Sequence, residues 1–316
     1  MIQISVILPT YNRPAGLRRC LEGFAAQTAP RDAFEVVVID DGSAEPAGPA
    51  AMQFADSVNV RSHRIDNSGP SAARNIAIEH ASAPLLLLYE DDLLPRPAII
   101  EHCLKFHESW PDEAHAALLW FRLDPCLRDQ PLHRWAFPKL YPFPADPGIY
   151  DWRKFWSGTL TCKKNIFRFG RFSDEFRALE DAELALRLTR RIDLRIHFER
   201  RLMGLHTRPL TLADVLARTY TAGYYDYRLA SKYPGAYGSD TPFEPEKLLL
   251  SEAELGSAIA TARTLLSTCP QPDSPGFRAL SGLCARADLH ARAEGWRTAR
   301  EGRCPEPPGT ASRFLK

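Results

Sequence analysis

The sequence lacks several features that define whole classes of protein. It contains no Cys-x-x-Cys pair, and its seven cysteines are an odd number, so we expect neither a zinc site built on paired cysteines nor a disulfide framework. Its longest apolar runs, such as residues 85–89, are far shorter than the roughly 20 residues that a membrane span requires. The N-terminal residues do not show the basic and apolar regions of a signal peptide. We therefore expect a cytoplasmic protein with reduced cysteines.

An excess of charge of either sign is also missing. The 316 residues include 40 Lys and Arg against 39 Asp and Glu, which gives a formal net charge of +1. This balance provides no general attraction to nucleic acids or to anionic membranes. We therefore expect no nucleic-acid partner and, at most, peripheral contact with a membrane. The chain is long enough for about two domains.

Short apolar runs alternate with helix-like stretches in the first half of the chain. Residues 2–8, 34–39 and 85–89 predict buried strands. Residues 17–27 and 70–81 predict helices, the second of which starts with a proline in its first turn. This alternation predicts an α/β fold with a mostly parallel sheet covered by helices.

The later part of the chain is less regular. Residues 124–150 are rich in proline and aromatic residues, which predicts a long loop region. Residues 180–191 predict a helix, and helical spacing dominates from residue 211, with a capping box at Ser251 and Glu254. Further strands are predicted at residues 58–65, 117–123, 158–167 and 193–198.

Polar clusters follow three of the predicted strands. They are Thr10-Tyr11-Asn12, Asp40-Asp41 and Glu90-Asp91-Asp92. The carboxyl ends of parallel strands meet at one edge of a sheet, where α/β folds bind ligands. Adjacent carboxylates repel one another unless a cation compensates, and Mg²⁺ and Mn²⁺ take carboxylate oxygens and bridge to phosphates. The alternative is an exposed acidic turn without a ligand.

Six short motifs follow one another between residues 5 and 187. They are residues 5–13 (SVILPTYNR), 38–43 (VIDDGS), 69–75 (GPSAARN), 88–95 (LYEDDLLP), 172–176 (FSDEF) and 180–184 (EDAEL) with Arg187. Together they resemble the family 2 glycosyltransferases of the GT-A fold. The resemblance implies a Rossmann-like GT-A domain over residues 1–210, with a nucleotide-binding half (1–110) and an acceptor half (111–210). Residues 211–316 would form a helical C-terminal region that ends in a loose tail.

The resemblance also implies a nucleotide-diphosphate sugar as the donor. Pro9, Thr10 and Tyr11 would line the base, with Tyr11 as a stacking face, and Asp41 would accept a hydrogen bond from a ring N–H. Arg74 would lie near the diphosphate, since a guanidinium suits phosphate oxygens. A pyrimidine with an N–H donor suits this set, so we expect a uridine diphosphate sugar. Thymidine and guanosine diphosphate sugars are the alternatives.

The chemistry that the resemblance implies is a single displacement with inversion. Asp92 would hold Mn²⁺ or Mg²⁺, which stabilises the leaving diphosphate, and Asp91 would lie near the ribose or sugar. Asp181 would take the proton of the acceptor hydroxyl, on a carbohydrate or another hydroxyl-bearing molecule, as the oxygen attacks the anomeric carbon. At the first turn of a helix, Asp181 would be kept ionised.

Other residues have two interpretations each. His206 is either a ligand of the metal or diphosphate or a structural histidine. Trp156, with Trp152 and Tyr150, forms either an acceptor platform or part of the core. Glu180 lies on the acceptor side, or its carboxylate simply favours the helix N-terminus. The C-terminal helices could cover the acceptor site, form a homodimer contact or touch a membrane surface.

The cluster Glu90-Asp91-Asp92 matches the family's DxD motif, so the resemblance implies that Glu90 also contacts the nucleotide sugar. The sequence departs from the family pattern at two places. Glu90 stands where the family usually has aspartate, and Ala178 and Leu179 stand where glycines often precede the Glu-Asp pair. Two other functions compete with transfer. A nucleotidyltransferase would need a glycine-rich phosphate loop and a lysine after the first strand, which residues 9–13 lack. A non-catalytic relative that binds a nucleotide sugar remains the main alternative.

Overall fold

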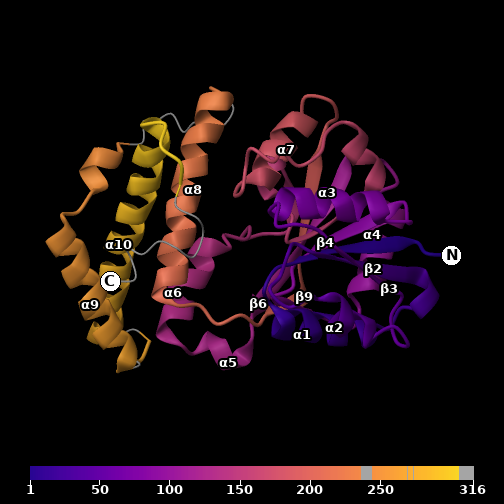
Figure 1. Ribbon diagram of the computed structural model, residues 1–316, viewed down its shortest axis with the longest axis horizontal. Helices are drawn as coiled ribbons and strands as arrows, with labels where there is room; N and C mark the ends of the chain where they lie inside the picture. The colour runs from indigo at the N-terminus through magenta and orange to yellow at the C-terminus, as the bar shows by residue number, and fades with distance from the viewer. Residues whose placement is uncertain (236–243, 269, 273, 306–316) are drawn as a thin grey trace. The chain divides into compact units, whose positions relative to one another are not determined.

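The computed structural model describes residues 1–235, 244–268, 270–272 and 274–305 (Figure 1). The chain divides into two compact units, which we call unit 1 and unit 2. Unit 1 comprises Met1–Asp124 and Phe143–Arg208. Unit 2 comprises Pro125–Pro142 and Pro209–Lys316, so a short segment from the middle of the sequence groups with the C-terminal helices.

In the described residues of unit 1, nine strands form one sheet in the order β3-β2-β1-β4-β8-β6-β9-β5, with β7 paired to β9. The strands β1, β2, β3, β4, β6 and β9 run in one direction, and β5, β7 and β8 run in the other. The bounds are β1 (Ile4–Thr10), β2 (Phe34–Asp40), β3 (Val60–Arg64), β4 (Leu85–Tyr89), β5 (Leu93–Pro95), β6 (His115–Leu123), β7 (Gly148–Tyr150), β8 (Thr159–Lys163) and β9 (Arg195–His206).

Helices cover both faces of this sheet. Figure 1 shows α1 and α2 on one face and α3 on the other. The strands between them, β1, β2 and β4, are rich in Val, Ile and Leu and almost wholly buried, as expected for strands covered on both sides. The bounds are α1 (Pro14–Ala25), α2 (Gly48–Met52), α3 (Pro70–His80), α4 (Ile99–Ser109) and α7 (Glu180–Leu188), with 3₁₀ turns η1 (Arg31–Ala33), η2 (Trp152–Lys154) and η3 (Lys164–Arg168).

The predicted fold class is confirmed, namely a mostly parallel sheet with flanking helices and a helical C-terminal region. The strand predicted at residues 193–198 continues to residue 206 as β9, because register shifts near Trp120 let it follow β6. The strand predicted at residues 158–167 is shorter, since β8 ends at Lys163 and η3 follows. Residues 48–52, 93–95 and 99–109 form elements that the sequence did not predict.

The described part of unit 2 is helical. Its elements are α5 (Pro125–Arg128), α6 (Pro131–Leu140), α8 (Leu212–Lys232), η4 (Pro245–Leu248), α9 (Glu252–Ser267) and α10 (Pro275–Arg300). Both side chains of the predicted capping box at Ser251 and Glu254 make their bonds, so this prediction is confirmed. Within the predicted tail, residues 306–316 lie outside the described residues.

The axes of α8 and α10 come very close at two glycines. A Cβ atom on Gly223 would lie 2.2 Å from the carbonyl oxygen of Arg292, and one on Gly295 would lie 2.0 Å from that of Tyr220. Either atom would overlap with backbone that cannot move independently. Both positions therefore require glycine for this helix packing.

The prediction of a long loop at residues 124–150 is wrong. Pro125 and Pro131 occupy the first turns of α5 and α6, where a missing N–H costs nothing. Leu132, Trp135 and Ala136 form one apolar face and join the core of unit 2. The helices that pack against this face come much later in the sequence. The local composition, which is rich in proline, therefore suggested a loop.

Among the described residues, no helix combines the length and the apolar character needed to cross a membrane.

Candidate active site

The ends of neighbouring strands bring the predicted polar clusters of β1, β2 and β4 to one edge of the sheet. Thr10 pairs in register with Asp40, and β4 lies on the other side of β1. The Thr10 hydroxyl donates a hydrogen bond to Asp91 Oδ2 at 2.6 Å. The backbone N–H of Asp41 donates to the Thr10 carbonyl oxygen at 3.0 Å. The clusters therefore meet as the sequence predicted.

The two adjacent aspartates after β2 have different roles in the structure. Asp40 is fully buried and accepts hydrogen bonds from the N–H groups of Ser43 and Ala47 and from Arg64. Although burial opposes ionisation, these bonds lower the pKa of Asp40 below its ordinary value. It holds its own loop together, so its charge is not available to a ligand.

Asp41 instead fixes the loop that enters α3. Its two carboxylate oxygens accept hydrogen bonds from the N–H groups of Ser68 at 2.7 Å and Gly69 at 3.0 Å. The amide group of Asn67 donates to the Asp41 carbonyl oxygen at 3.0 Å. A carboxylate oxygen can accept more than one hydrogen bond, so these contacts leave room for the predicted bond from a base.

Arg13 lies between the two aspartates of the acidic turn after β4. Its Nη1 is 2.9 Å from Asp91 Oδ1 and 3.4 Å from Asp92 Oδ2. Burial raises the pKa of Asp91 above its ordinary value, and Arg13 and Thr10 only partly oppose this shift. Arg13 was assigned no role from the sequence, although it is the last residue of the first motif. It partly neutralises the carboxylates whose repulsion led us to expect a cation.

Asp92 and His206 come together although they are 114 positions apart in the sequence. The imidazole Nε2 of His206, at the end of β9, lies 3.8 Å from Asp92 Oδ2, and both side chains are buried. Asp92 Oδ1 is buried and has no hydrogen-bond partner among the described residues. An unpaired buried carboxylate oxygen is costly, and a bound cation would satisfy it.

The residues present therefore fit a divalent ion held by few protein ligands. Among the described residues, no group of three or more His, Cys, Asp and Glu side chains could hold a metal ion. Mg²⁺ commonly binds through one or two carboxylates and completes its shell with substrate phosphates and water. Asp92, with His206 beside it, matches this kind of site.

The segment after β1 presents Tyr11 outward. Tyr11 is 48% exposed, so it is not part of the core and its ring is open to a planar ligand. Asn12 follows with a φ of 52°, which is uncommon outside glycine. Its side-chain oxygen accepts a hydrogen bond from the Ala44 N–H, and its own N–H donates to the Ser43 hydroxyl oxygen. Pro9 is half-buried at the end of β1.

Arg74 joins α3 to two acidic residues. It is buried and its Nη1 donates to Glu180 Oε1 at 2.6 Å, while its Nη2 lies 3.4 Å from Glu90 Oε1. Its guanidinium also lies over the ring of Phe172, 5.7 Å from the centroid. The structure thus brings Arg74 and Glu180 together, a contact that the sequence did not reveal.

Asp181 lies beside this pair at the start of α7. Its oxygens accept hydrogen bonds from the N–H groups of Ser157 at 3.2 Å and Ala182 at 2.8 Å. Burial and the adjacent Glu180 carboxylate raise the pKa of Asp181 to about 7, although Arg74 and the two N–H groups favour its charged form. The expectation that the helix start keeps Asp181 ionised is therefore wrong. Burial and a like charge outweigh the helix dipole here.

Leu179 has a left-handed backbone conformation, which glycine adopts more readily than leucine. Among the described residues, only Asn12 and Leu179 are non-glycine residues with a positive φ. Leu179 has φ 57° and ψ 21° and directly precedes Glu180. A left-handed conformation costs a non-glycine residue roughly 1–2 kcal/mol. Backbone strain of this kind clusters at functional sites, and it orients the first turn of α7.

The aromatic residues predicted on the acceptor side differ in their exposure. Trp152 is buried, whereas Trp156 is half-buried and packs on Phe143, with ring centroids 5.0 Å apart. The Tyr150 hydroxyl donates to the Asp146 carbonyl oxygen at 2.7 Å. Trp152 therefore fits the core interpretation, and Trp156 keeps a partly accessible face.

A cavity of about 240 Å³ opens between α1 and α2, next to the first motif. Thr10, Arg13 and Ser43 line it on the side of the strand ends, and Leu17 and Ala47 line it on the side of the helices. It extends the polar edge of the sheet into a partly apolar recess.

Comparison with known proteins agrees with this geometry. The sequence model of the family described as "Glycosyl transferase family 2" matches residues 5–170, which is more than half of the chain. The chain belongs to glycosyl transferase family 2. The resemblance drawn from the six motifs is thus confirmed.

Two curated relatives each match about a third of this chain. The glycosyltransferase AglE of Haloferax volcanii is 33% identical over 100 residues, which are 31% of this chain and 33% of that protein. Validoxylamine A glucosyltransferase of Streptomyces hygroscopicus subsp. jinggangensis is 36% identical over 106 residues, which are 33% of this chain and 25% of that protein. The matched segment spans a third or less of these relatives.

Two solved structures share the fold of this family 2 glycosyltransferase over most of its length. The S. aureus TarS fragment 1–349 in complex with UDP-GlcNAc has a TM-score of 0.55 at 16% identity and covers 96% of this chain and 93% of its own. The mannosyltransferase PcManGT from Pyrobaculum calidifontis, in complex with GDP-Man and Mn²⁺, has a TM-score of 0.59 at 19% identity, with coverages of 93% and 87%. At these identities the likeness establishes the fold.

Proposed function

We propose that this chain is an inverting, metal-dependent glycosyltransferase that transfers a sugar from a nucleotide-diphosphate sugar to an acceptor hydroxyl. The observation that carries the proposal is the position of Asp181, whose carboxylate accepts from the N–H groups of Ser157 and Ala182 and whose raised pKa suits a general base near neutral pH. The alternative is a relative that binds a nucleotide sugar without turning it over.

The donor would lie along the edge formed by the ends of β1, β2 and β4. Tyr11 would stack on the base, Asp41 would accept its ring N–H, and Pro9 and Thr10 would shape the pocket. Uridine is the proposed base, since Asp41 accepts from an N–H that uracil carries. The UDP-GlcNAc and GDP-Man complexes of the two structural relatives support a nucleotide sugar and leave uridine and guanosine to be separated by experiment.

Asp92 would hold Mn²⁺ or Mg²⁺ through its unpaired oxygen, with His206 as a second candidate ligand. The ion, when bound, supplies positive charge that stabilises the leaving diphosphate. Asp91, held by Thr10 and Arg13, would orient the ribose or sugar. Asp181 would remove the proton of the acceptor hydroxyl as that oxygen attacks the anomeric carbon from the face opposite the diphosphate. Glu180 and Trp156 would border the acceptor.

A panel of nucleotide sugars tests this proposal. With Mn²⁺ present, uridine diphosphate sugars should raise the melting temperature, since a ligand of the native state stabilises it, and they should be hydrolysed or transferred. If guanosine nucleotides raise the melting temperature and uridine nucleotides do not, the uridine assignment is wrong. If donors bind but are never turned over with any hydroxyl acceptor or water, the non-catalytic alternative holds.

A further inference from the structure

Glu90 occupies an unusual position between the donor edge and the predicted general base. It follows β4 directly and precedes Asp91 and Asp92. Its carboxylate turns to Arg74, with Oε1 3.4 Å from Nη2. The other end of the same guanidinium holds Glu180 at 2.6 Å. One arginine thus connects the acidic turn after β4 with the residue adjacent to Asp181.

A second connection runs through the backbone of the loop before β8. The Glu90 carboxyl group packs so closely on Gly158 that a Cβ there would lie 2.7 Å from its Cδ and 2.8 Å from its Oε1. Gly158 follows Ser157, whose N–H donates to Asp181 Oδ2 at 3.2 Å. Glu90 therefore packs against the very segment that holds the Asp181 carboxylate.

The length of the Glu90 side chain matters for both connections. An aspartate would end one methylene earlier, which withdraws the carboxylate by about 1.5 Å. The distance to Arg74 is already 3.4 Å, so a shorter side chain in the same backbone would lose this contact. It would also leave a gap over Gly158. The length of the glutamate side chain therefore suits both contacts.

We propose that Glu90 is a positioning residue for Asp181, acting through Arg74–Glu180 on one side and through Gly158–Ser157 on the other. The proposal rests on the function proposed above, in which Asp181 is the base. In this role Glu90 connects the residues proposed to bind the donor with the residue proposed to activate the acceptor. Loss of Glu90 should therefore lower the rate of transfer more than it weakens the donor complex.

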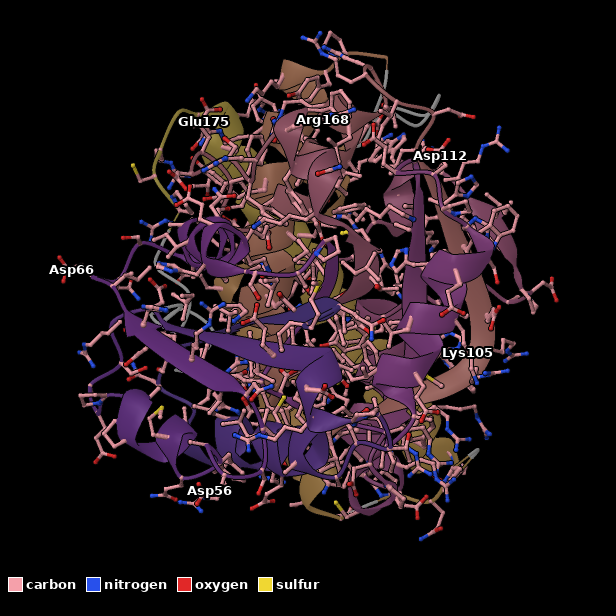
Figure 2. All side chains as sticks on the ribbon, turned by 90° about the vertical axis from the view of Figure 1, so that its right-hand side faces the viewer. Asp56, Asp66, Lys105, Asp112, Arg168 and Glu175 are labelled. Carbon is pink, nitrogen blue, oxygen red and sulfur yellow. The ribbon has the colours of Figure 1, made fainter. Side chains whose placement is uncertain are left out.

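Variants at Glu90 and Gly158 test the two connections. Glu90→Ala removes both and should lower kcat by about tenfold or more, because small displacements of a catalytic group are costly, with donor Kd changed by less than about threefold. Glu90→Gln keeps the packing on Gly158 and should lose less than Glu90→Ala. Asp56→Asn removes a charge that points outward from unit 1 (Figure 2) and should leave both quantities unchanged.

Gly158→Ala provides a reciprocal test. Its Cβ would collide with the Glu90 carboxyl group, so kcat should fall as in Glu90→Ala. In the double variant the colliding atoms are gone, and its kcat should equal that of Glu90→Ala alone. Independent roles would instead make the two losses multiply, and that result would overturn the proposal.

Hydrogen exchange supplies a readout that does not depend on turnover. The Ser157 amide should exchange faster in Glu90→Ala than in the wild type and in Asp56→Asn, at equal melting temperature. Unchanged exchange together with normal kcat in Glu90→Ala would refute the role of Glu90. If Asp181→Asn keeps normal turnover, Asp181 is not the base and that part of the proposed function is wrong. If Asp181→Asn is inactive but Glu90→Ala is fully active, only the role of Glu90 is rejected.

Discussion

The same residue type, glycine, serves different ends in the two units. In unit 1, Gly158 leaves space for a carboxyl group whose contacts lead to Asp181. In unit 2, Gly223 and Gly295 leave space for carbonyl oxygens of a neighbouring helix. The first glycine accommodates a charge, and the other two allow backbones to pack. Position in the fold, more than residue type, decides what a substitution will change.

The buried side chains show the same contrast. Unit 1 buries the carboxylates of Asp40, Asp91, Asp92 and Glu180 at or beside the proposed donor edge. The core cluster of unit 2 consists of apolar side chains from α6, α8, α9 and α10. Burying charge costs stability unless it is paired, so the sheet edge carries a cost that the apolar core cluster of unit 2 does not. We therefore expect substitutions in unit 1 to change chemistry and those in unit 2 to change stability.

Asp181→Asn should produce the largest effect. Turnover should fall by roughly 10²–10⁴-fold, because the amide cannot take the acceptor's proton. Donor affinity and the fold should be retained, since the two side chains are nearly the same size. Melting temperature, donor Kd and turnover should be measured on one preparation. Normal turnover would move the role of base to Glu180.

Gly295→Ala should destabilise unit 2 and leave the catalytic residues unchanged. A Cβ 2.0 Å from the Tyr220 carbonyl oxygen forces α8 and α10 apart, which should cost about 3 kcal/mol or more. Gly282→Ala is the matched control on the same helix, because nothing lies within 4 Å of its Cβ. It should gain about 0.5–1 kcal/mol from helix propensity. Urea unfolding followed by circular dichroism would compare them, and equal stabilities would contradict the packing described here.

Removing the metal or its proposed ligand should lower turnover on the order of a hundredfold, as expected for the loss of one group that stabilises developing charge. Asp92→Asn and excess chelator should each have this effect, and added Mn²⁺ should restore activity only in the chelated wild type. Full turnover of the wild type in chelator would exclude the proposed metal. Asp56→Asn controls for the loss of a negative charge.

The pH dependence sharpens the contrast further. Because the pKa of Asp181 is about 7, kcat/KM should rise about tenfold per pH unit up to that value and then level off. In an unfolded chain the pKa of an aspartate is about 3.9. The folded state therefore holds a proton that the unfolded state releases between about pH 4 and 7, and stability should fall as pH rises through this window. Asp181→Asn should lack this decline, and equal declines in both proteins would contradict the pKa.

Leu179→Gly should have the smallest effect. Glycine adopts φ 57° without strain, but it has greater freedom in the unfolded chain and loses the leucine side chain. The net change in unfolding free energy should stay within about 1 kcal/mol, with turnover unchanged. Leu179→Val should lower both the unfolding free energy and the turnover, because a β-branched residue rarely adopts this left-handed conformation. Equal behaviour of the two variants would mean that this backbone shape is unimportant.

The sequence predicted much of unit 1 because its signals are local. Buried strands such as β2 and β4 are short runs of Val, Ile and Leu that end in polar turns, and both were found within one residue of their bounds. The clusters at these ends met as expected, since parallel strands align their carboxyl ends. His206 was identified as a candidate ligand, and the structure does bring it to Asp92.

The remaining features depend on partners that are distant in sequence. Arg74 and Glu180 are 106 positions apart, and nothing local to either indicates their pairing. The raised pKa of Asp181 follows from burial, which a helix-start pattern does not reveal. Residues 125–140 suggested a loop because their proline content was visible, whereas the apolar helices that cover Trp135 come more than 70 positions later. Packing between residues so far apart cannot be predicted from a short stretch of sequence.

The antiparallel strand β8 lies between β4 and β6, yet it is made after both of them. During synthesis, β1 to β4 emerge first and can pair with one another, but the outer edge of β4 has no partner until residues 159–163 appear. Until then the nascent chain carries an open strand of four leucines and a tyrosine, the kind of edge that invites association with other chains. The gap in the middle of the sheet closes only when this late strand forms.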